Sequence, residues 1–142
     1  MAAEISLQHG VPDGLAEVLA LYDAVGWSVY TRRPEVLAAA LAGSSLVVTA
    51  RDSGGRLLGL ARVVSEGATV CYLQDVLVDP DAQRRGTGRA LVLAALAPYA
   101  TVRQKVLLTD DEPGQRAFYS SLGYAETRDV AGGTLRAFVR FD

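Results

Sequence analysis

Two glycines and three arginines stand between two apolar runs in the segment VDPDAQRRGTGRAL, residues 78–91. Backbone N–H groups at the start of a helix lack partners and carry partial positive charge, so they bind phosphate groups. Gly86 and Gly88 have no Cβ, which lets a ligand approach the main chain closely. The arginines that add positive charge are Arg84, Arg85 and Arg89. The segment predicts an anion site, although an ordinary helix start with surface arginines has the same residue types.

Two familiar phosphate motifs do not fit this spacing. A P-loop ends in Gly-Lys-Ser/Thr, whereas Gly88 is followed by Arg89 and Ala90. The dinucleotide fingerprint needs a small residue three positions after its second glycine, and that position holds Leu91. Neither motif therefore identifies the anion.

The composition predicts a single soluble domain spanning residues 1–142. Half of the residues are hydrophobic, 21% are charged, and the formal net charge is -2. A nucleic-acid binder needs a basic face, so no nucleic-acid partner is expected. The sequence has neither a run of about 18 apolar residues nor a signal-peptide core, so no membrane partner is expected. The single cysteine, Cys71, fits a cytoplasmic protein, and the single histidine, His9, has no companion ligands that predict a metal.

Apolar periodicity and turn residues predict the elements that must position the anion site. Those before the turn are strand Ala3–Gln8, helices Asp13–Val25 and Pro34–Gly43, and strands Leu46–Arg51, Leu57–Val64 and Cys71–Pro80. The segment DSGGR between the second and third strands is a strong hairpin signal.

The elements after the turn complete a mixed fold. They are helix Gly86–Tyr99, strand Lys105–Thr109, helix Pro113–Leu122, and strands Tyr124–Arg128 and Thr134–Phe141. Gly123 suits the left-handed position just past a helix. The order β-α-α-β-β-β-α-β-α-β-β predicts an α/β (α+β) fold, with a largely antiparallel sheet and helices on both faces. It differs from the regular alternation of a doubly wound nucleotide fold.

The segment QRRGTG, residues 83–88, resembles the Gln/Arg-x-x-Gly-x-Gly/Ala signature of the GCN5-related N-acetyltransferases (GNAT). Val-Asp-Pro stands directly before it, as is usual in that family. The segment AFYSSLGY, residues 117–124, resembles the family's second motif, Phe-Tyr-x-x-Leu-Gly-Phe/Tyr. The predicted element order also matches the family fold, so the resemblance extends over the whole chain.

The resemblance implies that acetyl-coenzyme A is the co-substrate. In the family, the turn binds the pyrophosphate and the preceding strand bulges away from its neighbour to admit the pantetheine arm. The matching coenzyme-binding residues are Val76, Leu77, Val78, Arg84, Arg85, Gly86, Thr87, Gly88 and Arg89. An N–H at Val76 would stabilise the oxyanion of the tetrahedral intermediate.

The resemblance also implies catalytic roles. Tyr119 matches the tyrosine that protonates the departing thiolate, although it also suits helix packing beside Phe118. Asp75 ranks first as general base because an uncompensated charge is costly in an apolar strand. Three further carboxylates remain candidates, although capping of the following helix is the expected role of at least one: Asp110, Asp111 and Glu112.

The acceptor is less well defined by sequence. YLQDVLV, residues 72–78, resembles a strand of polyamine-acetylating members, but Gln74 replaces their glutamate. Glu112 stands where members that acetylate protein N-termini commonly have asparagine. The residues predicted to line an amine pocket are Trp27, Tyr30, Tyr72 and Gln74. For Trp27 and Tyr30, plain packing between helices is the alternative.

These features predict an enzyme that transfers acetyl from acetyl-coenzyme A to a primary amine of a small molecule or peptide. The attack would be direct, within a ternary complex. The alternative is a module that binds acyl-coenzyme A for sensing or regulation without efficient turnover. Dimerisation is common in the family, so the resemblance allows a homodimer.

Overall fold

The computed structural model describes residues 4–142, which divide into two compact units, one ending at Leu107 and the other spanning Leu108–Asp142. The helices and strands of the first unit are β1 (Ser6–His9), α1 (Leu15–Ala24), α2 (Ser28–Thr31), α3 (Pro34–Gly43), β2 (Leu46–Arg51), β3 (Leu57–Ser65), β4 (Val70–Val78), α4 (Thr87–Leu96) and β5 (Gln104–Val106).

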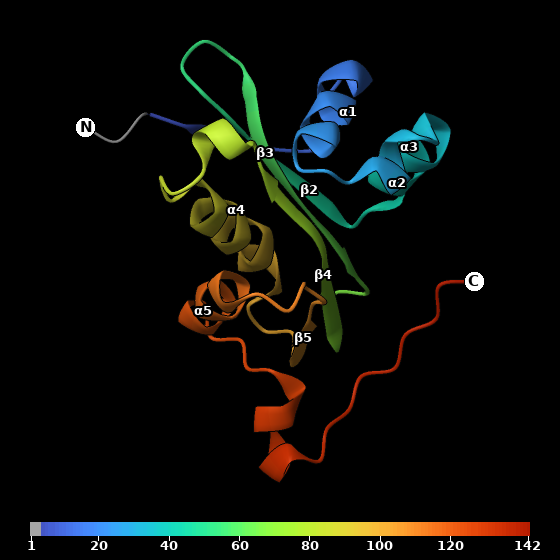
Figure 1. Ribbon diagram of the computed structural model, residues 1–142, viewed down its shortest axis with the longest axis vertical. Helices are drawn as coiled ribbons and strands as arrows, with labels where there is room; N and C mark the ends of the chain where they lie inside the picture. Colours follow the sequence, from blue (N-terminus) through green and yellow to red (C-terminus); the bar gives the residue numbers. More distant parts are fainter. Residues whose placement is uncertain (1–3) are drawn as a thin grey trace. The chain divides into compact units, whose positions relative to one another are not determined.

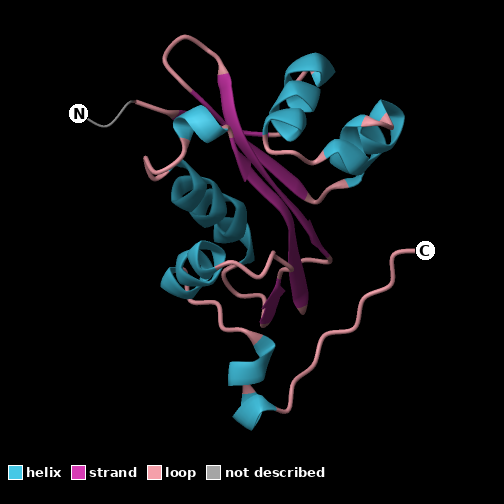
Figure 2. Cartoon of the chain, viewed as in Figure 1, coloured by secondary structure: helices cyan, strands magenta, loops and turns pink. Residues whose placement is uncertain are grey.

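One five-stranded sheet, in the order β1-β2-β3-β4-β5, forms the centre of the first unit. Its neighbouring strands are antiparallel except for β4 and β5, which are parallel. Helices α1, α2 and α3 lie on one face of this sheet, and α4 lies on the other (Figures 1 and 2). The predicted α/β class, with a largely antiparallel sheet and helices on both faces, is confirmed.

The core on the α1 side joins two helices to three strands. Its buried members are Val18, Leu21, Tyr22, Leu37, Leu41, Val47, Leu57, Leu60 and Leu77. Full burial of one such aliphatic side chain contributes about 1.5–3 kcal/mol. This packing fixes α1 and α3 against the middle of the sheet, where the polar residues of β3 and β4 lie.

A β-bulge interrupts the pairing of β3 with β4. Arg62 lies opposite Asp75, but the next residue, Val63, lies opposite Leu73. Gln74 is therefore the extra residue of β4. The bulge reverses which face the following residues point to, so the carboxylate of Asp75 lies on the α1 face.

Most predicted bounds in the first unit hold within a few residues. The predicted edge strand 3–8 is β1 at Ser6–His9, and Ala3 lies outside the described residues. The helix predicted to reach Tyr99 changes to a 3-10 turn at Ala97–Tyr99, because Pro98 has no N–H for an α-helical bond. The strand predicted at 105–109 is only Gln104–Val106.

In the second unit, α5 spans Pro113–Ser121 and Gly123 has the predicted left-handed conformation, with φ of 91°. The prediction of two final strands was wrong. Thr127–Asp129 and Ala131–Gly133 form 3-10 turns, and residues 134–142 have no regular secondary structure. Positive φ angles at three successive residues, Ala131 to Gly133, turn the chain out of the extended conformation.

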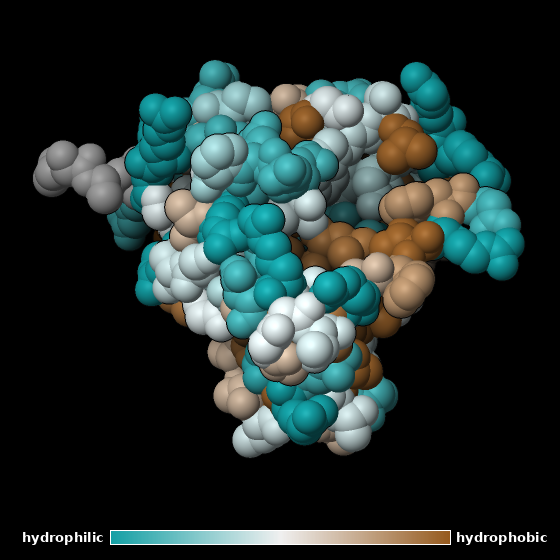
Figure 3. All heavy atoms as spheres, turned by 60° about the horizontal axis from the view of Figure 1, so that its bottom comes forward, coloured by the Kyte–Doolittle hydropathy of each residue, from teal (hydrophilic) through white to brown (hydrophobic). Residues whose placement is uncertain are grey.

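Hydrophilic residues predominate on the face shown in Figure 3, and hydrophobic residues form smaller groups between them. Single apolar side chains on a surface are normal for a folded domain. Among the described residues, no helix is both long enough and apolar enough to span a bilayer.

Gly59 on β3 is required by close packing. A Cβ at this position would lie 2.8 Å from Leu91 Cδ1 and 2.9 Å from the carbonyl oxygen of Leu77. Because the second neighbour is backbone, Gly59→Ala requires a shift of β4 or α4. We expect it to lower the free energy of unfolding by about 1–3 kcal/mol in urea denaturation.

Gly43→Ala is the matched control, because nothing lies within 4 Å of a Cβ there. It should leave the urea midpoint unchanged or raise it slightly, since alanine favours the helix. Equal midpoints for the Gly59→Ala variant and the unchanged protein would contradict the proposed close contact.

Candidate active site

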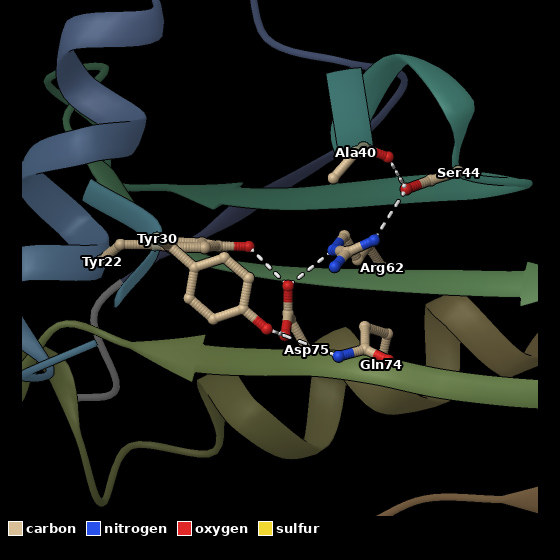
Figure 4. A network of polar contacts seen from close by, with 7 residues as sticks. All are labelled: Tyr22, Tyr30, Ala40, Ser44, Arg62, Gln74 and Asp75. Atoms are coloured by element: carbon tan, nitrogen blue, oxygen red, sulfur yellow. Dashed lines mark hydrogen bonds and ion pairs between the residues drawn. The ribbon is translucent and has the colours of Figure 1, made fainter. Parts of the chain in front are cut away.

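A buried polar network lies at the bulge of β4 (Figure 4). Asp75 is 2% exposed, and its Oδ2 accepts hydrogen bonds from Arg62 Nε at 2.5 Å and from Tyr22 Oη at 2.8 Å. Its Oδ1 accepts a hydrogen bond from Tyr30 Oη at 3.2 Å. The carboxylate is thus paired with a cation and surrounded by donors, which offsets the cost of burying its charge.

Arg62 connects this network to α3. It is 7% exposed, and its Nη1 donates to Ser44 Oγ at 3.4 Å. Ser44 Oγ in turn donates to the carbonyl oxygen of Ala40 at 2.7 Å. Burial alone would lower the pKa of Arg62, but the adjacent Asp75 raises it overall. The guanidinium therefore stays charged and holds β3, β4 and the end of α3 together.

Three aromatic rings from α1, α2 and the segment between them pack together, and two of them, Tyr22 and Tyr30, bond to the carboxylate. Tyr22 makes edge-to-face contacts with Tyr30, at 5.1 Å between ring centroids, and with Trp27, at 5.9 Å. Tyr22 is fully buried, whereas Trp27 and Tyr30 are half-buried. Burial, followed by the negative charge of Asp75, raises the pKa of the Tyr22 hydroxyl. The Tyr22 hydroxyl is thus a fixed donor inside the core, whereas Tyr30 reaches the edge of the core.

Gln74 and Tyr72 lie close to the same phenol. Gln74 Nε2 donates to Tyr30 Oη at 3.4 Å. Burial raises the pKa of Tyr72, and the nearby Tyr30 and Asp75 raise it further. Both β4 residues are half-buried. Of the four predicted pocket residues, Gln74 and Tyr72 thus lie close to the Tyr30 hydroxyl, and Trp27 packs beside the Tyr30 ring at 6.1 Å between centroids.

The edge of β4 is open beyond Tyr72. β5 pairs with β4 only at residues 70–72, although β4 continues to Val78. Asp79 N–H donates to the carbonyl oxygen of Leu58, and antiparallel pairs alternate between bonded and non-bonded positions. The backbone of Leu77 therefore faces β3, and the backbone groups of Val76 and Val78 face the open edge.

One of these open-edge groups is already engaged. Gln83 Nε2 donates to the carbonyl oxygen of Val78 at 3.1 Å. A ligand along this edge would find the N–H and C=O of Val76 and the N–H of Val78. These groups match the spacing that an extended amide chain uses when it adds to a sheet.

The predicted anion site coincides with the start of α4. Gly86 is the N-cap residue in a left-handed conformation, with φ of 80°, and no side chain caps the helix. The first bond of this helix runs from Ala90 N–H to the carbonyl oxygen of Gly86. The three arginines of the turn are exposed: Arg84, Arg85 and Arg89. The backbone donors of Thr87, Gly88 and Arg89 thus meet the requirement of a phosphate site.

Tyr119 lies on α5 in the second unit. Burial raises the pKa of its hydroxyl, so it keeps its proton at neutral pH. Its ring packs against Phe118 and Tyr124 at 4.9 and 6.0 Å between centroids. Glu112 occupies the N-cap position of α5, but its side chain makes no capping hydrogen bond.

The single cysteine and the acidic and histidine residues bear on two other kinds of chemistry. Cys71 is fully buried, and this burial raises the pKa of its thiol, which makes it a poor nucleophile. No group of three or more histidine, cysteine or acidic residues among residues 4–142 is arranged to bind a metal ion.

The sequence-based prediction missed three members of the network: Tyr22, Ser44 and Arg62. A signal for one of them was present, because Arg62 interrupts the apolar strand LLGLARVVS. A buried arginine needs an acidic partner. In the predicted hairpin order, the neighbouring strand offers Asp75 as that partner.

The buried ion pair should contribute strongly to stability. Arg62→Ala leaves Asp75 with an unpaired buried charge, so we expect a loss of about 3–5 kcal/mol in unfolding free energy. Thermal and urea denaturation measure this loss.

The matched control is Arg33→Ala, which removes an ion pair with Glu35. The Arg33 side chain is 71% exposed and the Glu35 side chain is 68% exposed. The melting temperature of this variant should not change measurably, because exposed ion pairs contribute little. Equal melting temperatures for the two variants would contradict the role given to the Arg62–Asp75 pair.

Comparison with known proteins identifies the family. The acetyltransferase (GNAT) domain family matches residues 42–126, which is more than half of the chain. An uncharacterised N-acetyltransferase of Pyropia yezoensis is 28% identical over 134 residues, covering 92% of this chain and 75% of the relative.

Solved structures agree with this assignment. A GNAT-family acetyltransferase from Streptococcus pneumoniae has a TM-score of 0.84 and 29% sequence identity, covering 98% of each chain. An aminoglycoside N-acetyltransferase, solved in complex with CoA, shares the fold at a TM-score of 0.68 and 16% identity, covering 99% of this chain and 97% of that one. Family match, sequence relative and fold agree: the chain belongs to the GNAT family and is an acetyltransferase.

Proposed function

We propose that this acetyltransferase moves the acetyl group of acetyl-coenzyme A to a primary amine of a small molecule or peptide. The amine attacks the thioester directly while both substrates are bound. The observation that carries this proposal is the open edge of β4, which lies beyond Tyr72 and leads to the start of α4. A cytoplasmic location and a homodimer stay predictions.

The coenzyme has two groups of partners in this proposal. The pyrophosphate is bound by the backbone N–H groups at the start of α4 and by the arginines beside it, because both supply positive charge. The pantetheine arm adds to the open edge of β4 through the backbone of Val76 and Val78. Leu77 supports this edge from the core, where its side chain is buried.

The amine lies on the α1 face of β4. The half-buried residues that line its pocket are Trp27, Tyr30, Tyr72 and Gln74. Gln74 and Tyr72 lie close to the Tyr30 hydroxyl, and Trp27 packs beside the Tyr30 ring. An alkylamine of pKa about 10.4 is neutral in only about one molecule in 2,500 at pH 7, which costs about 4.6 kcal/mol. A proton acceptor is therefore valuable, and we assign the final acceptor role to Asp75.

The thiolate needs a proton when it leaves. Tyr119 provides it in this proposal, and the N–H of Val76 stabilises the oxyanion that precedes departure. Direct attack is favoured over an acyl-enzyme because the chain's single cysteine is buried with a raised pKa.

Thiol release from acetyl-coenzyme A, measured against alkylamines, peptides and aminoglycosides, tests the proposal. At least one amine should accelerate release well above hydrolysis. Gly88→Val should raise the coenzyme Kd, measured by calorimetry, about tenfold or more, because the new side chain blocks the approach of phosphate to the helix start. Tight coenzyme binding without turnover of any amine would instead support a sensor module.

Gly114→Val is the matched control, since Gly114 is the second residue of α5 just as Gly88 is the second residue of α4. Nothing lies within 4 Å of a Cβ added at Gly114. This variant should leave coenzyme affinity unchanged. Equal coenzyme affinities for the two variants would contradict the proposal that the pyrophosphate binds at the start of α4.

Tyr119→Phe tests the proton donor. Because burial raises the pKa of this phenol above its ordinary value, the donor form persists to alkaline pH, and activity should fall only beyond the pH at which an exposed tyrosine loses its proton. The variant should lose up to about 10²-fold in kcat and lose this alkaline limb. The pH dependence of kcat measures both effects. An unchanged rate with an unchanged alkaline limb would show that Tyr119 is not the acid.

A further inference from the structure

The amine cannot reach Asp75 directly. The residue is 2% exposed, and Arg62, Tyr22 and Tyr30 already occupy its two oxygens. A carboxylate offers about four acceptor positions, and three are filled here. Any proton from a substrate must therefore pass through a neighbouring group that itself reaches the pocket.

Only one of the two phenols bonded to Asp75 is suited to this task. Tyr22 is fully buried in the core, whereas Tyr30 is half-buried among the proposed pocket residues. The Tyr30 hydroxyl donates its proton to Asp75 and accepts a hydrogen bond from Gln74 Nε2 (Figure 4). A phenolic oxygen has a second lone pair, which remains for a substrate N–H.

From this geometry we infer that the Tyr30 hydroxyl is the catalytic group that takes the proton of the attacking amine and passes its own proton to Asp75. Gln74 and Arg62 are then positioning residues, because they orient the phenol and the carboxylate. This inference rests on the proposed function and adds the group that touches the amine.

The step balances in atoms and charge. The ammonium N–H bond first breaks toward Tyr30 Oη as the phenolic proton moves to Asp75 Oδ1, which frees the nitrogen lone pair. This lone pair then forms the C–N bond to the acetyl carbonyl carbon, and the second proton leaves the nitrogen to water. Collapse of the intermediate breaks the C–S bond, the thiolate takes a proton from Tyr119, and Tyr119 regains a proton from water. After the amide leaves, the proton on Asp75 returns through Tyr30 to water.

The groups around the relay support this direction of transfer. The titratable side chains that face Asp75 and Tyr30 in the described chain are Tyr22 on α1, Arg62 on β3 and Tyr72 on β4. Arg62 bonds to Asp75 Oδ2, so Oδ1, which accepts from Tyr30, is the oxygen placed to receive the proton. The two other phenols keep their protons at neutral pH because burial raises the pKa of each.

Tyr30→Phe tests the relay while keeping the ring that packs on Tyr22. The probes are the best alkylamine and the best peptide α-amine from the thiol-release panel. At pH 7, kcat/KM for the alkylamine should fall about 10²-fold or more, whereas coenzyme affinity stays unchanged. The loss should be smaller for the α-amine, whose pKa is about 8 rather than about 10.4, and it should shrink as pH rises.

Tyr99→Phe is the control, because Tyr99 is a half-buried phenol in the 3-10 turn Ala97–Tyr99, outside the proposed site. Its kinetics and pH profile should match the unchanged protein. The relay is contradicted, while the proposed function stands, if kcat/KM of the Tyr30→Phe enzyme stays within about threefold of that of the unchanged protein at every pH. The same holds if the variant shows only a raised KM that does not depend on pH. An unchanged protein that binds coenzyme A but turns over no amine contradicts the proposed function and the relay together.

Discussion

A carboxylate buried in the middle of a sheet is the constraint on which this structure depends. Asp75 is 2% exposed, and its carboxylate is paired with Arg62 and accepts hydrogen bonds from two phenols, which offsets the cost of burying it. These donors come from α1, α2 and β3, and Arg62 extends the network to Ser44 at the end of α3. Satisfying one charge therefore fixes the three helices that lie on this face of the sheet.

The bulge at Gln74 gives one strand two functions. On one side, it places the Gln74 amide and the Asp75 carboxylate against the same phenol. On its edge, β4 continues past its short parallel partner and leaves backbone groups of Val76 and Val78 without a strand neighbour. A coenzyme arm along that edge would bring its thioester to the strand that also carries the amine site. A regular, fully paired strand would offer neither feature.

Local sequence signals predicted what depends on local physics. The hairpin at DSGGR has strong turn residues, helix α3 begins with a proline at its first position, and both formed as predicted. The one-turn helix α2 is too short for apolar periodicity to indicate. The Asp75 network joins residues 13, 45 and 53 positions away. The sequence carries a signal for Arg62 alone, and the bonds from the two phenols appear only in the three-dimensional structure. The prediction of two final strands was wrong, because an alternating pattern such as that in TLRAFVRF does not by itself supply a partner strand for the backbone hydrogen bonds.

A crystal structure of the protein with coenzyme A tests the central claim most directly. The account predicts that the pantetheine amides bond to the backbone of Val76 and Val78, with the sulfur directed toward Tyr30 and with Asp75 still bonded to Arg62. A coenzyme bound along another edge of the sheet, or an Asp75 carboxylate turned out of its ion pair to contact solvent, would contradict it.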